Sequence, residues 1–268
     1  GPLGPGVRWE PSRANLQAAV PPDFTGTVVI TGFIATDSQG LQTTLGRNGS
    51  DFSASIFGSL FDAGEIVIWT DVDGVLSADP RLVPEAQVID ALSCNEAMEL
   101  AYFGAKVIHP QTMAPAVQKR IPIWIKNTFA PDAPGTLIHD RTAPSPLVKG
   151  ITTVERIALV NLEGAGMIGV PGTAHRLFGA LREEGISVIL ISQGSSEHSI
   201  CFAVPEPEAD RAERVVRRAF EPELREGQIQ SVEVNRSCSI LAVVGDGMAG
   251  AHGVAAKVFT ALGLAGVN

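Results

Sequence analysis

Cysteine is scarce in this chain of 268 residues, and long apolar runs are missing. The three cysteines, Cys94, Cys201 and Cys238, are far apart and form no Cys-x-x-Cys pair, which argues against a disulfide framework and favours free buried thiols. No apolar run reaches the roughly 20 residues that would cross a bilayer, and no signal peptide is visible. The histidines show no metal-ligand spacing. We therefore expect no membrane contact and no dedicated metal site.

Positive charge is also in deficit. Lys and Arg number 20 against 29 Asp and Glu, which gives a net charge of −9 and an isoelectric point near 5.1. This balance argues against a nucleic-acid partner. With 45% hydrophobic and 18% charged residues, the chain can bury sizeable cores and should form two or more domains. The composition agrees with a cytoplasmic enzyme.

The sequence LGRNGSD, residues 45–51, combines two glycines with charged and hydroxyl side chains. Its glycines let backbone N–H groups approach an anion, and Ser50 or Asp51 then opens a helix predicted over residues 52–62. The N-terminal dipole of that helix favours negative charge, and Arg47 adds a planar fork of donors for a carboxylate or phosphate. Ser50 as a simple helix cap is the alternative.

A second group of charged side chains follows a short apolar segment. Residues 65–69, EIVIW, indicate a buried parallel strand, so Thr70 and Asp71 should emerge at its carboxyl end, where open α/β sheets bind ligands. Asp73-Gly74 and Asp79-Pro80 are also ordinary turn sequences, so each motif alone has a purely structural interpretation. The order of anion loop, helix, strand, acidic turn and arginine nevertheless favours a site for a nucleotide or a small acid.

The segments LGRNGSD, WTDVDGV and DPR resemble the nucleotide and substrate segments of aspartate kinases, within the amino-acid kinase fold. YFGAKVIHP is similar to the lysine-bearing segment of that family, and IKNT with PGT is similar to the strand and loop that close its kinase domain. Ser93 and Glu96 predict a capping box for a helix that ends near Phe103-Gly104, which leaves Lys106 just beyond the helix. A lysine that only caps the last carbonyl groups is the alternative.

An internal repeat occupies the second half of the chain. Residues 164–187 align without a gap, at an offset of 81 positions, with residues 245–268, and ten pairs are identical. Each copy begins with an apolar strand and passes through a glycine-rich turn into a helix. The predicted strands are residues 156–162, 186–192, 198–204, 229–234 and 239–244, and a further helix is predicted over 208–220. The βαββαβ order of the first copy predicts a ferredoxin-like unit with two helices on one face of its sheet.

VILISQGSSEHS, residues 188–199, resembles the effector segment of ACT domains, the amino-acid-sensing modules that follow the kinase domain in aspartate kinases. Gln193 and Ser195 offer amide and hydroxyl partners to an effector, on a backbone freed by Gly194. Glycines that only close tight turns are the alternative. The predicted domains are a leader or linker (1–22), the C-terminal part of an α/β amino-acid kinase domain with a parallel-rich sheet (23–148), a first ACT domain (149–236) and a truncated second one (237–268).

LGRNGSDFSASIFGSLF, ISQGSSEHSICFAVPE and CSILAVVGDGM are most similar to the bifunctional aspartate kinase–homoserine dehydrogenases of plants and bacteria. The resemblance implies that ATP, with Mg²⁺, phosphorylates the β-carboxylate of L-aspartate, the first step towards Lys, Thr, Met and Ile. It also implies feedback by threonine, with lysine as the alternative, and a homo-oligomer in the cytoplasm or the plastid stroma. The implied site residues are Arg47, Asn48, Gly49, Ser50 and Asp51 for aspartate, Thr70, Asp71, Leu76, Arg81 and Lys106 for ATP, and Gln193 and Ser195 for the effector.

Two departures from the family limit what the resemblance implies. Leu76 stands where many aspartate kinases have a tyrosine beside the nucleotide, so a ring contact there is lost. The family's Lys-Phe-Gly-Gly-Thr/Ser turn has no match, and residues 11–22 indicate a linker or loop. We therefore expect an interior piece of a larger enzyme that is inactive alone, with any dehydrogenase half beyond Asn268. An amino-acid-sensing module without activity, or another kinase such as one acting on glutamate, stays open.

Overall fold

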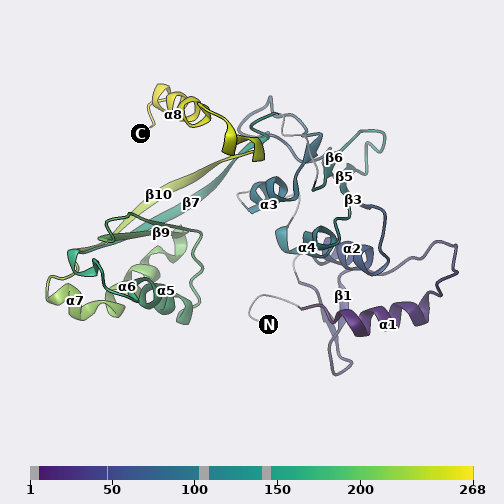
Figure 1. The fold of residues 1–268 in the computed structure, drawn as a ribbon, viewed down its shortest axis with the longest axis horizontal. Helices are drawn as coiled ribbons and strands as arrows, with labels where there is room; N and C mark the ends of the chain where they lie inside the picture. The colour runs from purple at the N-terminus through teal and green to yellow at the C-terminus, as the bar shows by residue number, and fades with distance from the viewer. Residues whose placement is uncertain (1–5, 47, 103–108, 141–145, 268) are drawn as a thin grey trace. The chain divides into compact units, whose positions relative to one another are not determined.

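The computed structural model describes residues 6–46, 48–102, 109–140 and 146–267. The chain divides into two compact units, shown in Figure 1. Unit 1 comprises Gly1–Thr152 and Ala242–Asn268, and unit 2 comprises Thr153–Leu241. The domain boundaries predicted from the sequence stay predictions. Among the described residues, no helix is both long and apolar enough to cross a membrane.

Unit 1 contains a mixed four-stranded sheet in the order β3-β5-β6-β4. Its strands are β3 (Ile66–Thr70), β4 (Ala91–Leu92), β5 (Ile123–Asn127) and β6 (Thr136–Ile138). β3 pairs with β5 and β4 pairs with β6 in parallel, whereas β5 and β6 are antiparallel. The helices are α2 (Gly49–Leu60), α3 (Cys94–Tyr102) and α4 (Pro110–Gln118). Buried aliphatic side chains of β5, such as Ile123 and Ile125, form the core with Leu100 of α3, which confirms the predicted α/β class with a parallel-containing sheet.

The strand predicted over residues 65–69 is present, but the prediction that it is buried was wrong. Ile66 is buried, whereas the Trp69 side chain is 51% exposed. The reason is that β3 lies at the edge of the described sheet, with β5 as its neighbour on one side. The helix that follows the glycine loop was predicted to begin at residue 52 but begins at Gly49, and Asn48, the residue before it, has a left-handed backbone conformation.

The N-terminal segment forms a helix and a hairpin. α1 (Trp9–Ala19) replaces the loop predicted over residues 11–22. Pro11 does not prevent this helix, since it lies in the first turn, where backbone N–H groups have no helical partner. β1 (Ile34–Thr36) and β2 (Gln42–Thr44) form a separate antiparallel pair. No residue of α1 is buried, so its packing contributes little to the core.

Unit 2 has the ferredoxin-like arrangement that the sequence predicts. Its sheet has the order β10-β7-β9-β8, made of β7 (Gly150–Glu163), β8 (Leu190–Gln193), β9 (Ser199–Pro205) and β10 (Ser231–Val244). The helices are α5 (Thr173–Glu183), α6 (Ala209–Ala219) and the short α7 (Glu221–Arg225). α5 and α6 lie side by side (Figure 1). Leu177, Leu181 and Val216 of these helices share a buried core with Phe202 of the sheet.

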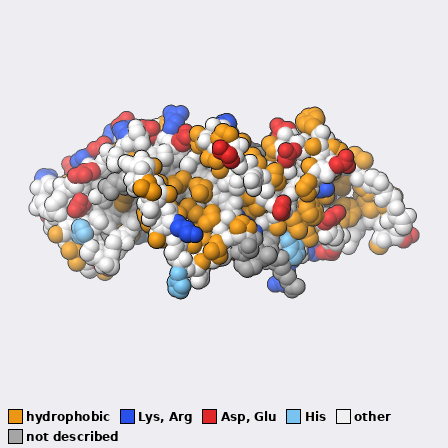
Figure 2. Space-filling view, turned by 90° about the horizontal axis from the view of Figure 1, so that it is seen from above, with side chains coloured by type: hydrophobic (Ala, Val, Ile, Leu, Met, Phe, Trp, Pro, Cys, Tyr) orange, Lys and Arg blue, Asp and Glu red, His pale blue; other side chains and the backbone are white. Residues whose placement is uncertain are grey.

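The internal repeat is visible in the backbone. α8 (Val254–Leu264) begins and ends 81 positions after α5, and each helix follows a left-handed glycine, Gly172 or Gly253. The two copies differ in burial, because α5 lies in a core whereas no residue of α8 is buried and Phe259 is 71% exposed. Apolar side chains, orange in Figure 2, reach the surface in many places on the face shown there.

Two predictions about strands and thiols need correction. The separate strands predicted over 229–234 and 239–244 are one strand, β10, since no glycine or proline interrupts the intervening Asn-Arg-Ser-Cys. The three cysteines are free as predicted but half-buried rather than buried. Each lies on a helix or strand whose surface is partly exposed.

Candidate functional site

The glycine loop ends at the first turn of α2. Gly49 is buried, and a Cβ at this position would lie 2.7 Å from the Phe33 ring, so a larger residue would displace the loop. The Ser53 hydroxyl donates to the Gly49 carbonyl at 2.8 Å and accepts from the Phe33 N–H at 2.9 Å. These contacts fix the start of α2 against the segment before β1.

Predicted aspartate-site residues gather in this first turn. Asn48, Gly49, Ser50 and Asp51 are consecutive at the N-terminus of α2, and Ser50 is exposed. Burial raises the pKa of the Asp51 carboxyl, and a hydrogen bond with Ser50 opposes that rise. Unpaired N–H groups at a helix start attract anions. Arg47 lies outside the described residues, so its part in the site stays a prediction.

The acidic turn after β3 is held by hydrogen bonds to the end of β5. Thr70 lies opposite Asn127 in the parallel pair, and the Thr128 N–H donates to the Thr70 carbonyl at 2.8 Å. The Thr70 hydroxyl donates to Asp71 Oδ1 at 3.2 Å, and Asn127 Nδ2 donates to Asp73 Oδ1 at 2.6 Å. Sequence reasoning did not select Asn127, although a polar residue at the carboxyl end of a strand was the available signal.

The other predicted nucleotide residues lie in the loop between β3 and β4. Leu76 forms an antiparallel bridge with Val88. The Arg81 guanidinium holds the Asp79 carboxylate through both oxygens, with Nε at 3.0 Å from Oδ1 and Nη2 at 2.5 Å from Oδ2. Lys106 lies outside the described residues, so its distance to this loop stays a prediction.

We infer that the two loops belong to one edge of the sheet. α2 packs against β3, and a helix joined to the next strand by a short connection runs antiparallel to it. The first turn of α2 therefore lies towards the carboxyl end of β3, where Thr70 and Asp71 emerge. This arrangement places anion-binding N–H groups and an acidic, hydrogen-bonded turn on the ligand-binding edge of an α/β sheet.

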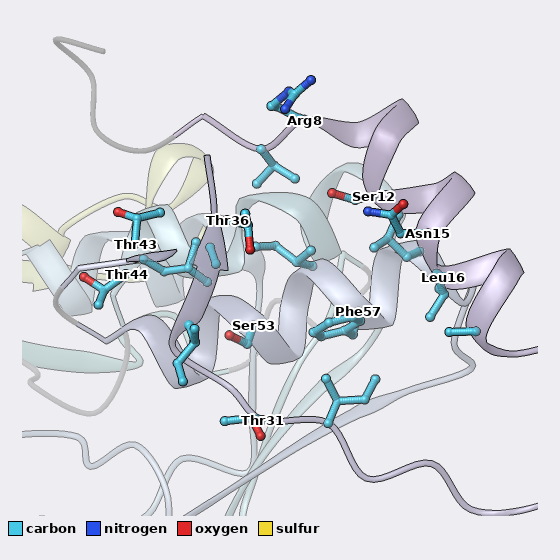
Figure 3. A pocket seen from close by; sticks show the side chains of 18 of the residues that line it. Arg8, Ser12, Asn15, Leu16, Thr31, Thr36, Thr43, Thr44, Ser53 and Phe57 are labelled. Carbon is cyan, nitrogen blue, oxygen red and sulfur yellow. The ribbon is translucent and has the colours of Figure 1, made fainter. Parts of the chain in front are cut away.

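A cavity of ≈ 850 Å³ borders the glycine loop (Figure 3). Its walls come from α1, the β1–β2 hairpin and α2, and the labelled side chains include Ser12 and Asn15 of α1 and Phe57 of α2. Leu45 and Ser53 connect the cavity to the loop. The sequence did not predict this space, because it depends on contacts between distant segments.

A smaller cavity of ≈ 300 Å³ lies in unit 2, beside the first glycine turn of the repeat. The turn from Gly169 to Thr173 forms one wall, and Gln193, Glu197 and Ile200 form another. The Gly169 N–H donates to Glu197 Oε2 at 3.0 Å. The structure thus brings Gln193 to the turn, whereas Ser195 does not line the cavity, and both residues are exposed.

Sequence reasoning missed Glu197, because its partner is 28 positions away.

No group of three or more His, Cys, Asp or Glu side chains is placed to hold a metal ion in the part of the chain that the structure describes.

Comparisons with known proteins agree with both halves of this description. Residues 4–127 match the Amino acid kinase family, and residues 160–220 and 241–268 match the ACT domain. A bifunctional aspartokinase/homoserine dehydrogenase of Zea mays is 50% identical over 247 residues, which are 90% of this chain and 27% of the maize protein. The chain belongs to the aspartate kinase family. An enzyme of the same name from Haemophilus influenzae is 49% identical over 242 residues, covering 90% of the chain and 30% of the relative.

Solved aspartate kinases share the fold. The Clostridium acetobutylicum enzyme superposes with a TM-score of 0.87 at 29% identity, over 98% of this chain and 60% of the other. Escherichia coli aspartokinase III, in complex with aspartate and ADP, gives a TM-score of 0.69 at 33% identity, over 86% and 51%. The chain spans less than a third of the length of the bifunctional relatives named above.

Proposed function

We propose that this chain supplies part of the kinase site, and the regulatory module, of an enzyme that phosphorylates L-aspartate with ATP. A β-carboxylate oxygen bonds to the γ-phosphorus as the bond from that phosphorus to the β,γ-bridging oxygen breaks, and ADP leaves with the electron pair. The products are aspartyl phosphate and ADP. The observations that support the proposal are the packing of α2 against β3 and the hydrogen-bonded acidic turn that follows β3.

The residues divide between two ligands. Arg47 pairs with an aspartate carboxylate, and the turn from Asn48 to Asp51 supplies N–H groups and order. Thr70, Asp71 and Leu76 hold the adenosine part of ATP, and Arg81 and Lys106 neutralise phosphate charge, which is the main catalytic requirement of phosphoryl transfer. The complex of the Escherichia coli enzyme with aspartate and ADP supports this choice of ligands.

Mg²⁺ is proposed to arrive with the nucleotide. Asp73 is exposed on the turn after β3, and carboxylate oxygens are ligands that this ion accepts alongside phosphates. The ion would neutralise charge on the transferred phosphoryl group.

Regulation is proposed to act through the cavity beside Gly169. Gln193, in the cavity wall, would contact an amino-acid effector, with threonine as the first candidate and lysine as the alternative. Ser195 lies outside this wall, so its contact with the effector stays a prediction. A complex of Escherichia coli aspartokinase III with lysine supports an amino-acid effector. We further propose a homo-oligomer, located in the cytoplasm or, for a plant source, in the plastid stroma, because the plant relatives are named chloroplastic.

A chimera tests the proposal. In the Haemophilus chimera, this chain replaces the matching segment of the Haemophilus influenzae enzyme, to which it is 49% identical. We expect aspartate-dependent ADP formation and, in the presence of hydroxylamine, aspartyl hydroxamate. Glutamate-dependent activity would support another amino-acid kinase, and threonine binding without any kinase activity would support a pure sensing module. Either result would overturn the proposed reaction.

A further inference from the structure

Glu96 is a buried carboxylate that joins two distant segments of unit 1. Its side chain is on α3, and the residue is 2% exposed. Oε2 accepts from the Ser93 N–H at 2.9 Å, and the Ser93 hydroxyl accepts from the Glu96 N–H at 3.0 Å. Oε1 accepts from the Asp246 N–H at 2.9 Å, 150 positions along the chain. The predicted capping box therefore exists. One oxygen of the Glu96 carboxylate completes the box with Ser93, and the other oxygen accepts from Asp246, which lies outside α3.

The segment that Glu96 holds is the glycine turn of the second repeat copy. This turn packs closely, since a Cβ on Gly245 would lie 2.1 Å from the Leu147 carbonyl oxygen. The Lys149 N–H donates to the Val244 carbonyl at 2.8 Å, and Val244 belongs to the same core as Leu100 of α3. Movement of the turn would therefore disturb α3 directly.

The start of β7 also contacts the loop between β3 and β4, which carries Leu76 and Arg81 and is called the nucleotide loop below. The Ile151 N–H donates to the Ser77 carbonyl at 2.8 Å, one residue after Leu76. A Cβ on Gly150 would lie 3.1 Å from the Ser77 carbonyl oxygen and 3.0 Å from Leu100. The beginning of β7 thus contacts both the nucleotide loop and α3.

In the first repeat copy, the matching backbone N–H group has a different acceptor. Ala165 corresponds to Asp246 at the offset of 81, and its N–H donates to Gln230 Oε1 at 2.8 Å. In the first copy, a neutral amide of the same ACT unit satisfies this N–H group. In the second copy, a charged carboxylate of the kinase domain does so, and charged hydrogen bonds are roughly twice as strong as neutral ones.

We propose that Glu96 couples the glycine turn of the second ACT copy, residues 245–250, to the kinase site. The proposal rests on the proposed function and deepens its regulation. An effector acts only through a difference in affinity between active and inactive states. If this turn moves relative to α3, its hydrogen bond to Glu96 weakens, because hydrogen bonds weaken steeply with distance and angle. That difference transmits effector binding to α3 and the nucleotide loop.

The first test uses the Haemophilus chimera and three variants. Glu96→Gln exchanges one acceptor oxygen for a donor, so either Ser93 or Asp246 loses its partner. Ser93→Ala removes the hydroxyl of the cap but leaves the bond to Asp246, and Glu99→Gln changes an exposed carboxylate on the same helix. Inhibition is measured with threonine and separately with lysine, together with uninhibited turnover.

We expect Glu96→Gln to raise the half-inhibitory concentration at least fivefold while uninhibited kcat stays within twofold. Ser93→Ala and Glu99→Gln should keep the parent inhibition. Unchanged inhibition in Glu96→Gln, or an equal shift in Ser93→Ala, would overturn the coupling. If Glu96→Gln does not fold, Glu96→Asp, which keeps the charge but shortens the reach, takes its place. A parent chimera without aspartate-dependent ADP formation would instead overturn the proposed function.

The second test needs no kinase activity and uses the 268-residue chain. Amide hydrogen exchange at Asp246 should be at least tenfold faster in Glu96→Gln than in the parent. Exchange at Ala165, whose acceptor is Gln230, should stay the same, as should Asp246 exchange in Glu99→Gln. Equal exchange at Asp246 in the parent and in Glu96→Gln would overturn the coupling, whatever the chimera does.

Discussion

Arg156 and Ser237 lie 81 positions apart and adopt the same left-handed backbone conformation, with φ of 58° and 56°. Arg156 lies within β7 and Ser237 within β10. Residues other than glycine rarely adopt this conformation, which costs of order 1–2 kcal/mol. The same local distortion is thus present at the matching position of both repeat copies.

The first prediction follows from this conformation. The Ser237 side chain is exposed, so its removal costs few contacts. We expect Ser237→Gly to stabilise unit 2 by about 0.5 kcal/mol and Ser237→Val to destabilise it by about 1–2 kcal/mol, since a β-branched residue tolerates positive φ poorly. Urea unfolding of the 268-residue chain measures both variants. A more stable Ser237→Val chain would contradict the strain.

The second prediction concerns Asn127 as the support of the acidic turn. Asn127→Ala removes the bond to Asp73 and should raise the KM for ATP in the Haemophilus chimera by about five- to thirtyfold, equivalent to 1–2 kcal/mol. The KM for aspartate should change less than twofold. Asp132→Ala, an exposed carboxylate in the following loop, is the control. Equal losses for both substrates would mean that Asn127 supports the fold rather than the nucleotide.

The third prediction separates the two substrates. Arg47→Ala should chiefly weaken aspartate use, whereas Arg81→Ala and Lys106→Ala should chiefly weaken ATP use. Each loss should amount to about 2–4 kcal/mol of transition-state stabilisation, because a charged hydrogen bond to a bound substrate is removed. Steady-state kinetics of the chimera give kcat/KM for each substrate. With Arg120→Ala as a surface control, wild-type kinetics in all three variants would refute the assignment.

The fourth prediction concerns the effector cavity. Gln193→Ala should weaken threonine binding by roughly five- to thirtyfold, or 1–2 kcal/mol, and should relieve inhibition with nearly unchanged uninhibited turnover. Ser192→Ala is the matched control, since neighbouring strand residues point to opposite faces of the sheet. Calorimetric titration of threonine into the chimera compares the variants. The same threonine affinity in Gln193→Ala and the parent would exclude Gln193 from the effector site.

The fifth prediction concerns the reactivity of Cys94. Burial, with a contribution from Asp140, raises the pKa of its thiol from 9.0 to about 12. At pH 8 the thiolate fraction is then about a thousandfold smaller than in an ordinary cysteine, so alkylation by iodoacetamide should slow by about that factor. The stabilising effect of the neutral thiol is complete below pH 9.0 and is lost as pH rises towards 12. Mass spectrometry of folded and urea-unfolded chain measures the ratio, and equal rates would contradict the shift.

Local sequence signals predicted most of the elements because short-range chemistry determines them. The repeat predicted α5 and α8, and Ser93 with Glu96 predicted the start of α3. Residues 11–22, which contain Pro11, Pro21 and Pro22, were predicted as a linker or loop, although Pro11 occupies a position in the first helical turn that tolerates proline.

Long-range contacts account for what the sequence did not predict. The exposure of Trp69 depends on which strand lies at the sheet edge, and no local pattern specifies strand order. The bonds from Glu197 to Gly169 and from Glu96 to Asp246 join residues 28 and 150 positions apart. Both acidic residues belong to sequence motifs, but only the folded chain shows their long-range partners, Gly169 and Asp246.

The crowding at Gly245 has a further consequence when it is set beside its counterpart, Gly164. A Cβ on Gly164 would lie 2.6 Å from the Ile229 Cα, whereas a Cβ on Gly245 would meet the Leu147 carbonyl oxygen. The matching glycine is therefore required in both repeat copies, for unrelated reasons. Tolerance to substitution in one copy therefore gives no information about the other, because each glycine is confined by its own surroundings.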